Sequence, residues 1–387
     1  MKGLTAVAAA ALGAAGTAPA VESKGMKYVT LGRTGMRVPQ FLGDWMGERD
    51  MYDIALKAGV NYWHKIGTWR NPAPYDLFRS LDRDSFYCDT IIDSLDKDRA
   101  IQLFEKSLAA TGLKMIDGFK VHSMYKSAED IKTKMGAIQA FEELKRQGKT
   151  RYLMLSQHIN TAEVFEAAVE SDLFDLIQIP INPTVPQDYF TKEEFPRRIG
   201  QEQYFRTIKK AADKGIAIVA QKVFLGGTKT WDEVKGLRDK VKEYLPDDKG
   251  IATALIHWTL AVPGVAAFGN LLFTRNQLIE NLAAVGGKLT DSEDKGLELF
   301  AKAIGTHVCR MCGTCLRTNP GGLAVSEILR FKSYHAQGMP GMARAYYAGL
   351  PEDKKLRPGE DRSPYDRACR YGLPLASLLK DAERLLA

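Results

Sequence analysis

The sequence predicts an α/β fold, a (β/α)8 TIM barrel followed by a small helical domain. Two observations indicate the barrel: short apolar runs alternate with amphipathic helical stretches, and this alternation continues over about 250 residues. A third observation, a cluster of cysteines near the end, sets the last part of the chain apart. The 387 residues suffice for one barrel and one smaller domain. An open doubly wound sheet is the alternative arrangement of the same elements.

The composition is that of an ordinary globular protein. Hydrophobic residues make up 45% and charged residues 26% of the chain, which excludes a disordered chain, a collagen and a coiled coil as overall descriptions. The net charge is +7, but the basic residues are scattered along helical stretches beside acidic ones. This pattern is typical of a solvated surface, so no nucleic-acid partner is predicted, and nucleic-acid binding is the weaker alternative.

Residues 1–25 resemble a signal for export. An apolar, alanine-rich run precedes the small-residue triplet Ala18-Pro19-Ala20, as before a signal-peptidase site. A periplasmic location is therefore expected, and an alanine-rich tail on a cytoplasmic protein is the alternative. Only Lys2 stands where a twin-arginine signal has its arginine pair, so export by that route implies a truncated start. No other run is long and apolar enough to span a bilayer, so no transmembrane helix is expected after signal removal.

The elements of the barrel follow from the apolar runs. Strands are predicted at residues 38–44, 60–64, 86–92, 117–122, 151–156, 174–181, 216–222 and 264–269. Between them, helices are predicted at residues 100–110, 128–147 and 161–170. Asn160 is the expected N-cap of the last of these helices. Gly59, Gly112, Gly148 and Gly215 fall at expected helix ends, where a left-handed cap residue favours glycine.

Candidate catalytic residues lie at the ends of the predicted strands. The chemistry of such barrels takes place at the carboxyl ends of the strands, where this chain has Asp44, His64, His122 and Lys222. His64 and His122 could act as acid and base, with Asp44 orienting one of them and Lys222 polarising a substrate oxygen. The alternative is that the histidines are structural groups at the barrel rim.

Seven segments carry a family resemblance. They read, in order, LGRTGMRV, DIALKAGVNYW, IDGFKVH, LKRQGKTRYLMLSQH, FDLIQIPIN, GIAIVAQKVFLGG and VPGVAAFGN followed by QLIENL. In this order and spacing they resemble the aldo/keto reductases over residues 28–285. The resemblance implies a barrel over residues 26–303, closed at its bottom by a hairpin at residues 26–38. It also implies a small-molecule substrate and NADPH or NADH bound at the carboxyl mouth.

The resemblance also locates the family's four catalytic positions. The family reduces carbonyls with a tyrosine as proton donor, whose pKa a lysine and an aspartate lower, while a histidine orients the carbonyl. Here the aspartate position is His64, the tyrosine position is Trp69, and the lysine position falls at Asp89 or Thr90. Only the histidine is retained, as His122. Because an indole cannot donate a proton as a phenol does, reduction through these four positions is not expected.

Cofactor contacts are better retained. At the positions that bind the nicotinamide in the family, this chain has Ser156, Gln157 and Gln178. At the positions that bind the adenine end of the cofactor, it has Gln277, Glu280 and Asn281. Gln157 replaces an asparagine but keeps the amide. Arg275 is the only cation in the preceding loop. The alternative is that these are helix-surface positions.

The cysteines predict an iron-sulfur centre in residues 304–387. The expected ligands of one 4Fe-4S cluster are Cys309, Cys312, Cys315 and Cys369. Pro320 keeps its place in the ferredoxin-type pattern, but Asn319 stands where the fourth local cysteine belongs, so the remote cysteine completes the set. A subgroup of aldo/keto reductases that this chain resembles carries such an extension. Zinc, and free thiols or disulfides, are the alternatives. Cys88 lies in an apolar run and is expected in the core.

Together these observations predict an oxidoreductase that resembles the aldo/keto reductases. It would pass electrons between an iron-sulfur cluster, a carbonyl or alcohol substrate and a redox protein partner. One alternative is a barrel without catalysis that serves as an electron-transfer or scaffold subunit. Another is non-redox acid/base chemistry by His64 and His122 beside a structural cluster. The fold alone does not separate these alternatives, because this fold hosts many activities.

Overall fold

Eight parallel strands form the centre of the protein. The computed structural model describes residues 26–68, 74–158, 161–184, 188–189, 199–305, 307–311, 314–315, 322–369 and 371–386. The strands are β3 (Phe41–Leu42), β4 (Tyr62–Trp63), β5 (Tyr87–Ile92), β6 (Gly118–His122), β7 (Tyr152–Ser156), β8 (Leu176–Pro180), β11 (Ala217–Gln221) and β12 (Val265–Gly269). Each lies within a range predicted from the sequence.

The strands close into a barrel. Their order is β3-β12-β11-β8-β7-β6-β5-β4, and a parallel bridge between Gly43 and Trp63 joins the first strand to the last. The backbone N–H of Gly43 donates to Tyr62 and that of His64 donates to Gly43 across this seam. The predicted (β/α)8 barrel is therefore confirmed, and the open sheet is excluded.

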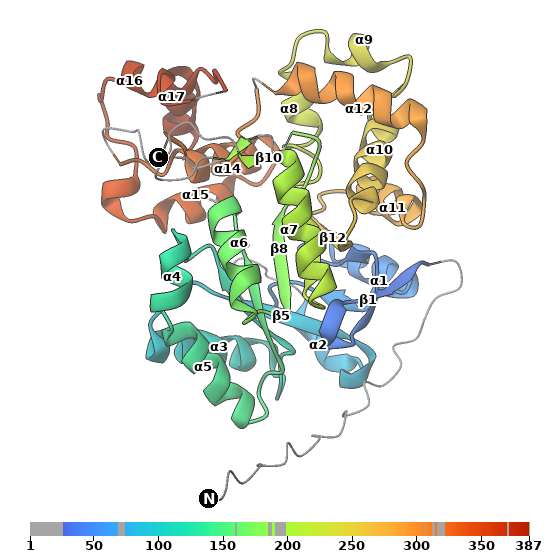
Figure 1. The fold of residues 1–387 in the computed structure, drawn as a ribbon, viewed down its shortest axis with the longest axis vertical. Helices are drawn as coiled ribbons and strands as arrows, with labels where there is room; N and C mark the ends of the chain where they lie inside the picture. The colour runs from blue at the N-terminus through green and yellow to red at the C-terminus, as the bar shows by residue number, and fades with distance from the viewer. Residues whose placement is uncertain are drawn as a thin grey trace, which may run out of the picture.

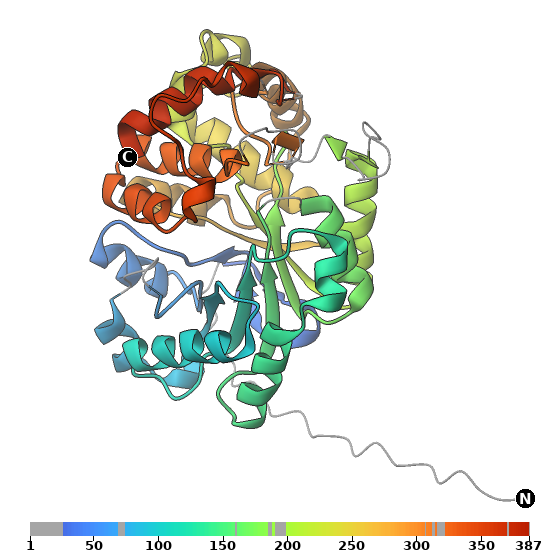
Figure 2. The ribbon, with the colours of Figure 1, turned by 90° about the vertical axis from the view of Figure 1, so that its left-hand side faces the viewer.

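Helices surround the barrel (Figure 1, Figure 2). They are α1 (Arg49–Lys57), α2 (Tyr75–Ser80), α3 (Lys97–Thr111), α4 (Ala128–Thr133), α5 (Gly136–Arg146), α6 (Thr161–Ser171), α7 (Gln201–Asp213), α8 (Thr228–Asp232), α9 (Leu237–Val241), α10 (Asp248–Ala261), α11 (Arg275–Ala284) and α12 (Asp291–Ile304). The short strands β9 (Asp188–Tyr189) and β10 (Ile199–Gly200) form a separate antiparallel pair. The four predicted capping glycines have positive φ angles, which confirms the helix ends expected from them.

The single helix predicted over residues 128–147 is wrong, because the chain forms α4 and α5 there. The break precedes Gly136, the first residue of α5. A Cβ atom at this position would lie 2.3 Å from the carbonyl oxygen of Leu95. This close approach between two segments requires glycine, and it depends on tertiary packing that the helical periodicity does not record.

A hairpin closes the bottom of the barrel, as predicted. Its strands are β1 (Tyr28–Thr30) and β2 (Arg37–Pro39), paired antiparallel. Leu31 and Met36 between these strands are fully buried and pack against Tyr62 and Met154, which belong to barrel strands. Burying each such side chain stabilises the fold by roughly 1.5–3 kcal/mol.

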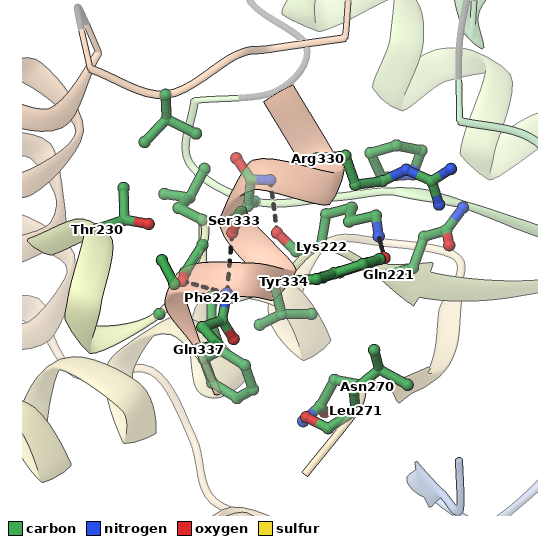
Figure 3. A pocket seen from close by; sticks show the side chains of 18 of the residues that line it. Gln221, Lys222, Phe224, Thr230, Asn270, Leu271, Arg330, Ser333, Tyr334 and Gln337 are labelled. Carbon is green, nitrogen blue, oxygen red and sulfur yellow. Dashed lines mark hydrogen bonds between the residues drawn. The ribbon is translucent and has the colours of Figure 1, made fainter. Parts of the chain in front are cut away.

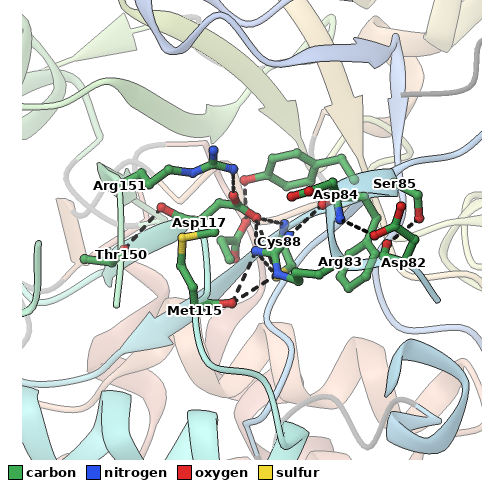
Figure 4. A network of polar contacts seen from close by, with 12 residues as sticks. Asp82, Arg83, Asp84, Ser85, Cys88, Met115, Asp117, Thr150 and Arg151 are labelled. Atoms are coloured by element: carbon green, nitrogen blue, oxygen red, sulfur yellow. Dashed lines mark hydrogen bonds and ion pairs between the residues drawn. The ribbon is translucent and has the colours of Figure 1, made fainter. Parts of the chain in front are cut away.

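An ionic network holds three strands together at the same end of the barrel (Figure 4). The Oδ2 atom of Asp117, just before β6, accepts hydrogen bonds from Arg83 at 2.7 Å and from the backbone N–H of Cys88 at 2.9 Å. Arg151, just before β7, forms an ion pair with Asp117 Oδ1. Asp117 is fully buried, and its charge is balanced by two guanidinium groups. This network lies opposite the carboxyl mouth and is structural.

The last part of the chain is helical and has its own apolar core. It comprises α14 (Val325–Ala336), α15 (Pro340–Ala348), the 3-10 turn η3 (Glu352–Lys354), α16 (Ser363–Asp366) and α17 (Leu375–Leu386). Ile328, Tyr365 and Leu379 are buried in that core. Figure 2 shows these helices in orange and red beyond the carboxyl ends of the strands. The side-chain N–H of Gln337 donates to the carbonyl oxygen of Gly226 at 2.7 Å, which ties α14 to the barrel. Of the helices described, none is both long and apolar enough to span a membrane.

Candidate functional site

The carboxyl ends of the strands open into a cavity of about 420 Å³. Strands β7, β8 and β11 contribute Ser156, Gln178 and Gln221 to its walls, and the loop after β11 adds Lys222. Helix α14 contributes Tyr334 from the opposite side (Figure 3). The helical C-terminal part therefore roofs the barrel mouth, where the fold concentrates its polar strand ends.

Two histidines form a hydrogen-bonded pair in the wall of this cavity. The Nε2 atoms of His122 and His158 are 2.9 Å apart, and Nδ1 of His122 lies 3.1 Å from Asp93 Oδ1. Nδ1 of His158 is buried without a hydrogen-bond partner among the described residues, so a proton there would be costly. The His158 proton therefore belongs on Nε2, which donates to His122, and His122 in turn donates from Nδ1 to Asp93.

The electrostatics agree with a neutral His158. Burial holds the pKa of His158 well below its usual value, and the nearby charges of Lys222 and Arg330 lower it further. Sequence reasoning missed His158, although it follows Ser156 and Gln157 directly after β7. The presence of a histidine so close to the end of a predicted strand could have identified His158 as a candidate.

His64 lies in the barrel interior and is not among the residues that line the cavity. Its Nδ1 atom is 2.6 Å from Asp89 Oδ2 and 2.7 Å from Lys120 Nζ. Lys120 Nζ is itself 2.6 Å from Asp89 Oδ2, and the Tyr62 hydroxyl donates to the same oxygen at 2.9 Å. The structure thus places His64 and His122 in separate networks and does not bring them together as an acid/base pair.

The interior network is an ion pair with a neutral histidine. Burial would raise the pKa of Asp89, but the charge of Lys120 and the His64 hydrogen bond outweigh burial and lower it. Burial and Lys120 together lower the pKa of His64. Lys120 was not predicted as a candidate, although a lysine inside a predicted buried strand is an unusual residue that could have signalled it.

Asp44 and Lys222 both line the cavity but have partners other than a histidine. Asp44 Oδ2 is 2.6 Å from Lys65 Nζ. Lys222 Nζ donates to the hydroxyl oxygen of Tyr334 at 3.1 Å. Lys222 has a φ of +59°, a strained conformation for a residue with a side chain, and its carbonyl oxygen accepts a hydrogen bond from Asn182 at 2.8 Å.

Tyr334 is the residue of the cavity that sequence reasoning could not find. Burial alone would raise its pKa, but the positive charges of Lys222 and Arg330 and the hydrogen bond from Lys222 outweigh burial and lower the pKa to about 7. The guanidinium carbon of Arg330 lies 5.8 Å from the centre of the Tyr334 ring. Tyr334 and Lys222 are 112 residues apart, so no local motif joins them.

The comparison with protein families settles the relationship of this chain. Residues 36–295, more than half of its length, match the family described as the aldo/keto reductase family. The chain belongs to the aldo/keto reductase family. Trp69, at the family's tyrosine position, lies outside the described residues.

Solved structures of aldo/keto reductases share the fold. The holo form of an aldo-keto reductase from Bacillus halodurans is 20% identical, with a TM-score of 0.57, and the match covers 74% of this chain and 99% of that one. Its apo form gives the same identity and coverage with a TM-score of 0.55. No curated protein matches the chain. At this identity the structural likeness establishes the barrel fold alone.

Most of the cofactor residues expected from the family line the same cavity. These are Ser156, Gln178, Gln277, Glu280 and Asn281. Gln157 is fully buried outside the cavity lining, and its side-chain N–H donates to the carbonyl oxygen of Tyr125 at 3.0 Å. A hydroxyl and several side-chain amides along one cavity fit the carboxamide and ribose groups of a nicotinamide dinucleotide.

Two cations lie near the residues predicted for the far end of the cofactor, but of these only Lys249 lines the cavity. Arg275, at the start of α11, pairs with Glu48 at 3.1 Å and with Asp50 at 2.6 Å. Lys249 lines the cavity near Glu280. The Gln277 side chain accepts hydrogen bonds from the backbone N–H groups of residues 273 and 274 in a capping box, so it fixes the start of α11.

Three of the four predicted cluster ligands lie around one small cavity of their own. They are Cys309, Cys315 and Cys369. Cys312, like Asn319 and Pro320, falls outside the residues that the structure describes. Within the described part of the chain, no three His, Cys, Asp or Glu side chains are placed to hold a metal ion. Cys88 is fully buried in the barrel core, as expected.

Proposed function

We propose that this member of the aldo/keto reductase family is an oxidoreductase for a small carbonyl or alcohol substrate, with NADPH or NADH as its cofactor. One observation carries the proposal: most of the residues at family cofactor positions and a group of proton-transferring side chains line the same cavity at the barrel mouth. An apolar cavity with a few converging polar groups is the usual form of a small-molecule site.

The residues of the cavity divide into two groups. Ser156 and Gln178 would bind the carboxamide of the cofactor, and Glu280 and Asn281 would bind its far end. When bound, the nicotinamide supplies or accepts a hydride. Lys222 places a positive charge where a substrate oxygen gains negative charge, and the roof formed by α14 limits the access of water.

An iron-sulfur cluster in the C-terminal part belongs to the same proposal. Cys309, Cys312, Cys315 and Cys369 would hold it, and the cavity shared by three of these thiols supports the assignment. The thiolates of a cubane bind different iron atoms, so they need not converge as the ligands of a single ion do. The cluster would transfer single electrons, which makes a redox protein partner part of the proposal.

Export to the periplasm completes the proposal. Its only support is the sequence pattern of residues 1–25, which lie outside the described residues. Fractionation of cells that express the full chain tests it. Recovery of a shortened protein in the periplasmic fraction is expected, whereas the full-length chain confined to the cytoplasm would contradict it.

A titration of the anaerobically purified protein with NADPH and with NADH, followed by nucleotide fluorescence, tests the function. Binding of either nucleotide is expected. Ser156→Ala should weaken binding by about 2- to 10-fold, because one hydrogen bond is lost. Ser107→Ala, a buried serine of α3 outside the cavity lining, should bind as the wild type does. If the wild type binds neither nucleotide, the proposal fails and the barrel is better explained as a scaffold or electron-transfer subunit.

A further inference from the structure

We propose that Tyr334, on the C-terminal helix α14, is the proton donor for carbonyl reduction at the barrel mouth. Lys222 positions the Tyr334 hydroxyl and stabilises the phenolate that forms when the proton is donated. This inference rests on the proposed function and adds to it a catalytic residue from outside the barrel. Figure 3 shows the side chain of Tyr334 directed from α14 towards Lys222 at the end of β11.

The hydrogen bond between the two residues leaves the phenol proton available. Lys222 Nζ lies 3.1 Å from the Tyr334 oxygen, and an ammonium group can only donate. The Tyr334 O–H is therefore not used in this bond and can donate to another acceptor. Since both side chains line the 420 Å³ cavity, a substrate oxygen bound there is such an acceptor.

The charges around Tyr334 favour its ionised form. Lys222 faces it from the end of β11, Arg330 from one turn earlier on α14, and Lys65 from the segment after β4. Arg330 forms an ion pair with Glu327, and Lys65 forms one with Asp44, so part of their charge is balanced. The remaining excess of positive charge brings the pKa of Tyr334 to about 7, close to the value at which a general acid is most effective.

The histidines of the cavity are less suited to this task. Both ring nitrogens of His122 are engaged, one with Asp93 and the other with His158. His158 is neutral near pH 7 because burial and nearby cations hold its pKa well below the usual value, and its Nε2 is the atom bonded to His122. The Tyr334 hydroxyl, in contrast, accepts a hydrogen bond from Lys222, and its own proton is not donated in that bond.

In the proposed step, a hydride and a proton convert the substrate carbonyl into an alcohol. When bound, reduced nicotinamide dinucleotide would supply a hydride to the carbonyl carbon, and the π electron pair of the C=O bond would move to oxygen. That oxygen takes the hydroxyl proton of Tyr334, which gives the alcohol and a phenolate. The ammonium group of Lys222 stabilises the phenolate, which regains a proton from solvent before the next cycle.

The ionisation of Tyr334 can be measured without any turnover. Ultraviolet difference spectra of the folded wild type should show one tyrosine that ionises near pH 7, and Tyr334→Phe should lose this transition. Lys222→Met should move the transition to higher pH because a positive charge next to the phenol is removed. Tyr347→Phe is the matched control, since Tyr347 is buried in the C-terminal core and accepts a hydrogen bond from the Leu356 N–H. An unchanged transition in Tyr334→Phe would overturn the assignment.

The catalytic role is tested with two probes and NADPH or NADH. Para-nitrobenzaldehyde needs a proton donor for its alkoxide, whereas the reduced form of phenanthrenequinone is a far weaker base. Tyr334→Phe should lower kcat for the aldehyde by at least about 100-fold, lower quinone reduction much less, and leave nucleotide binding unchanged. Tyr347→Phe should match the wild type with both probes.

The outcomes separate the two proposals. If the wild type binds nucleotide and reduces both probes, but Tyr334→Phe reduces the aldehyde at the wild-type rate with the wild-type pH profile, the role of Tyr334 is refuted and the proposed function stands. If the wild type neither binds nucleotide nor reduces either probe, the proposed function fails, and the catalytic role of Tyr334 falls with it.

Discussion

His158 illustrates how a single buried side chain ties stability to pH. Its ring is almost completely buried, it bonds to His122, and it lies near the charges of Lys222 and Arg330. Because these surroundings disfavour the imidazolium ion, the folded protein holds His158 neutral at a pH where the unfolded chain would protonate it. The interior residue His64 behaves in the same way.

The stability of the protein should therefore fall on the acid side. A histidine whose folded pKa is lowered contributes stability that is fully present above its unfolded pKa of about 6.5 and is lost as pH falls below that value. Each such histidine adds up to about 1.4 kcal/mol per pH unit to the slope. Urea unfolding of His158→Gln, measured from about pH 7 to about pH 5, should show a shallower slope than the wild type. An identical slope would mean that His158 is protonated in the folded protein.

Among single residues, the sequence predicted those cavity residues that lie at the end of a strand. His122, Ser156 and Lys222 could be placed because a barrel strand ends beside each of them. Tyr334 could not, since it reaches the cavity from a helix whose docking depends on the tertiary fold. His64 was misplaced at the mouth, because the sequence gives the end of a strand but not how deep in the barrel a side chain lies.

The helices and strands also divide into those that the sequence predicts and those that depend on tertiary packing. All eight barrel strands were predicted, since short apolar runs bounded by polar and glycine residues are local signals. The break between α4 and α5 was missed, because its cause is the carbonyl of Leu95 in a distant part of the chain. Helical periodicity continues through the break, so only the close packing at Gly136 reveals it.

Two glycines in first turns of helices make a matched test of this packing. Gly136→Ala should destabilise the protein by about 1–3 kcal/mol, because the new Cβ would lie 2.3 Å from the Leu95 carbonyl oxygen and one segment must move. At Gly341, in α15, a Cβ meets nothing within 4 Å, so Gly341→Ala should be neutral or stabilise by about 0.5–1 kcal/mol. The measurement is the melting temperature of each variant in thermal unfolding. Equal melting temperatures would show that the Leu95 carbonyl does not require glycine at position 136.

Over the whole molecule, the chain combines an aldo/keto reductase barrel with a helical part that has a separate apolar core. The two parts meet at the mouth, where Gln337 bonds to Gly226 and Tyr334 bonds to Lys222. Of the cysteines that the structure describes, Cys88 lies in the barrel core, whereas Cys309, Cys315 and Cys369 lie around a small cavity beside the helical part. Metal chemistry is therefore expected to depend on the helical part alone.

A pair of cysteine variants tests that expectation. Cys369→Ala should lose most of the iron and the broad blue absorption expected of the proposed cluster in the anaerobically purified protein, since a cubane would lose one of its four ligands. Cys88→Ala, in the barrel core, should keep the iron content of the wild type. Iron analysis and visible spectra are the measurements. Equal iron in both variants would exclude Cys369 as a ligand, and zinc in place of iron would favour a tetrahedral site.

The hydrogen bond between Lys222 and Tyr334 also has a consequence for biosynthesis. A ribosome makes the chain from its N-terminus, so the barrel strands emerge well before α14. A nascent chain that has folded only its barrel holds Lys222 without Tyr334, and its mouth has no roof. Tyr334 lies 112 residues after Lys222, so the two side chains can meet only once synthesis has passed α14, and the finished mouth marks a chain that has reached this point.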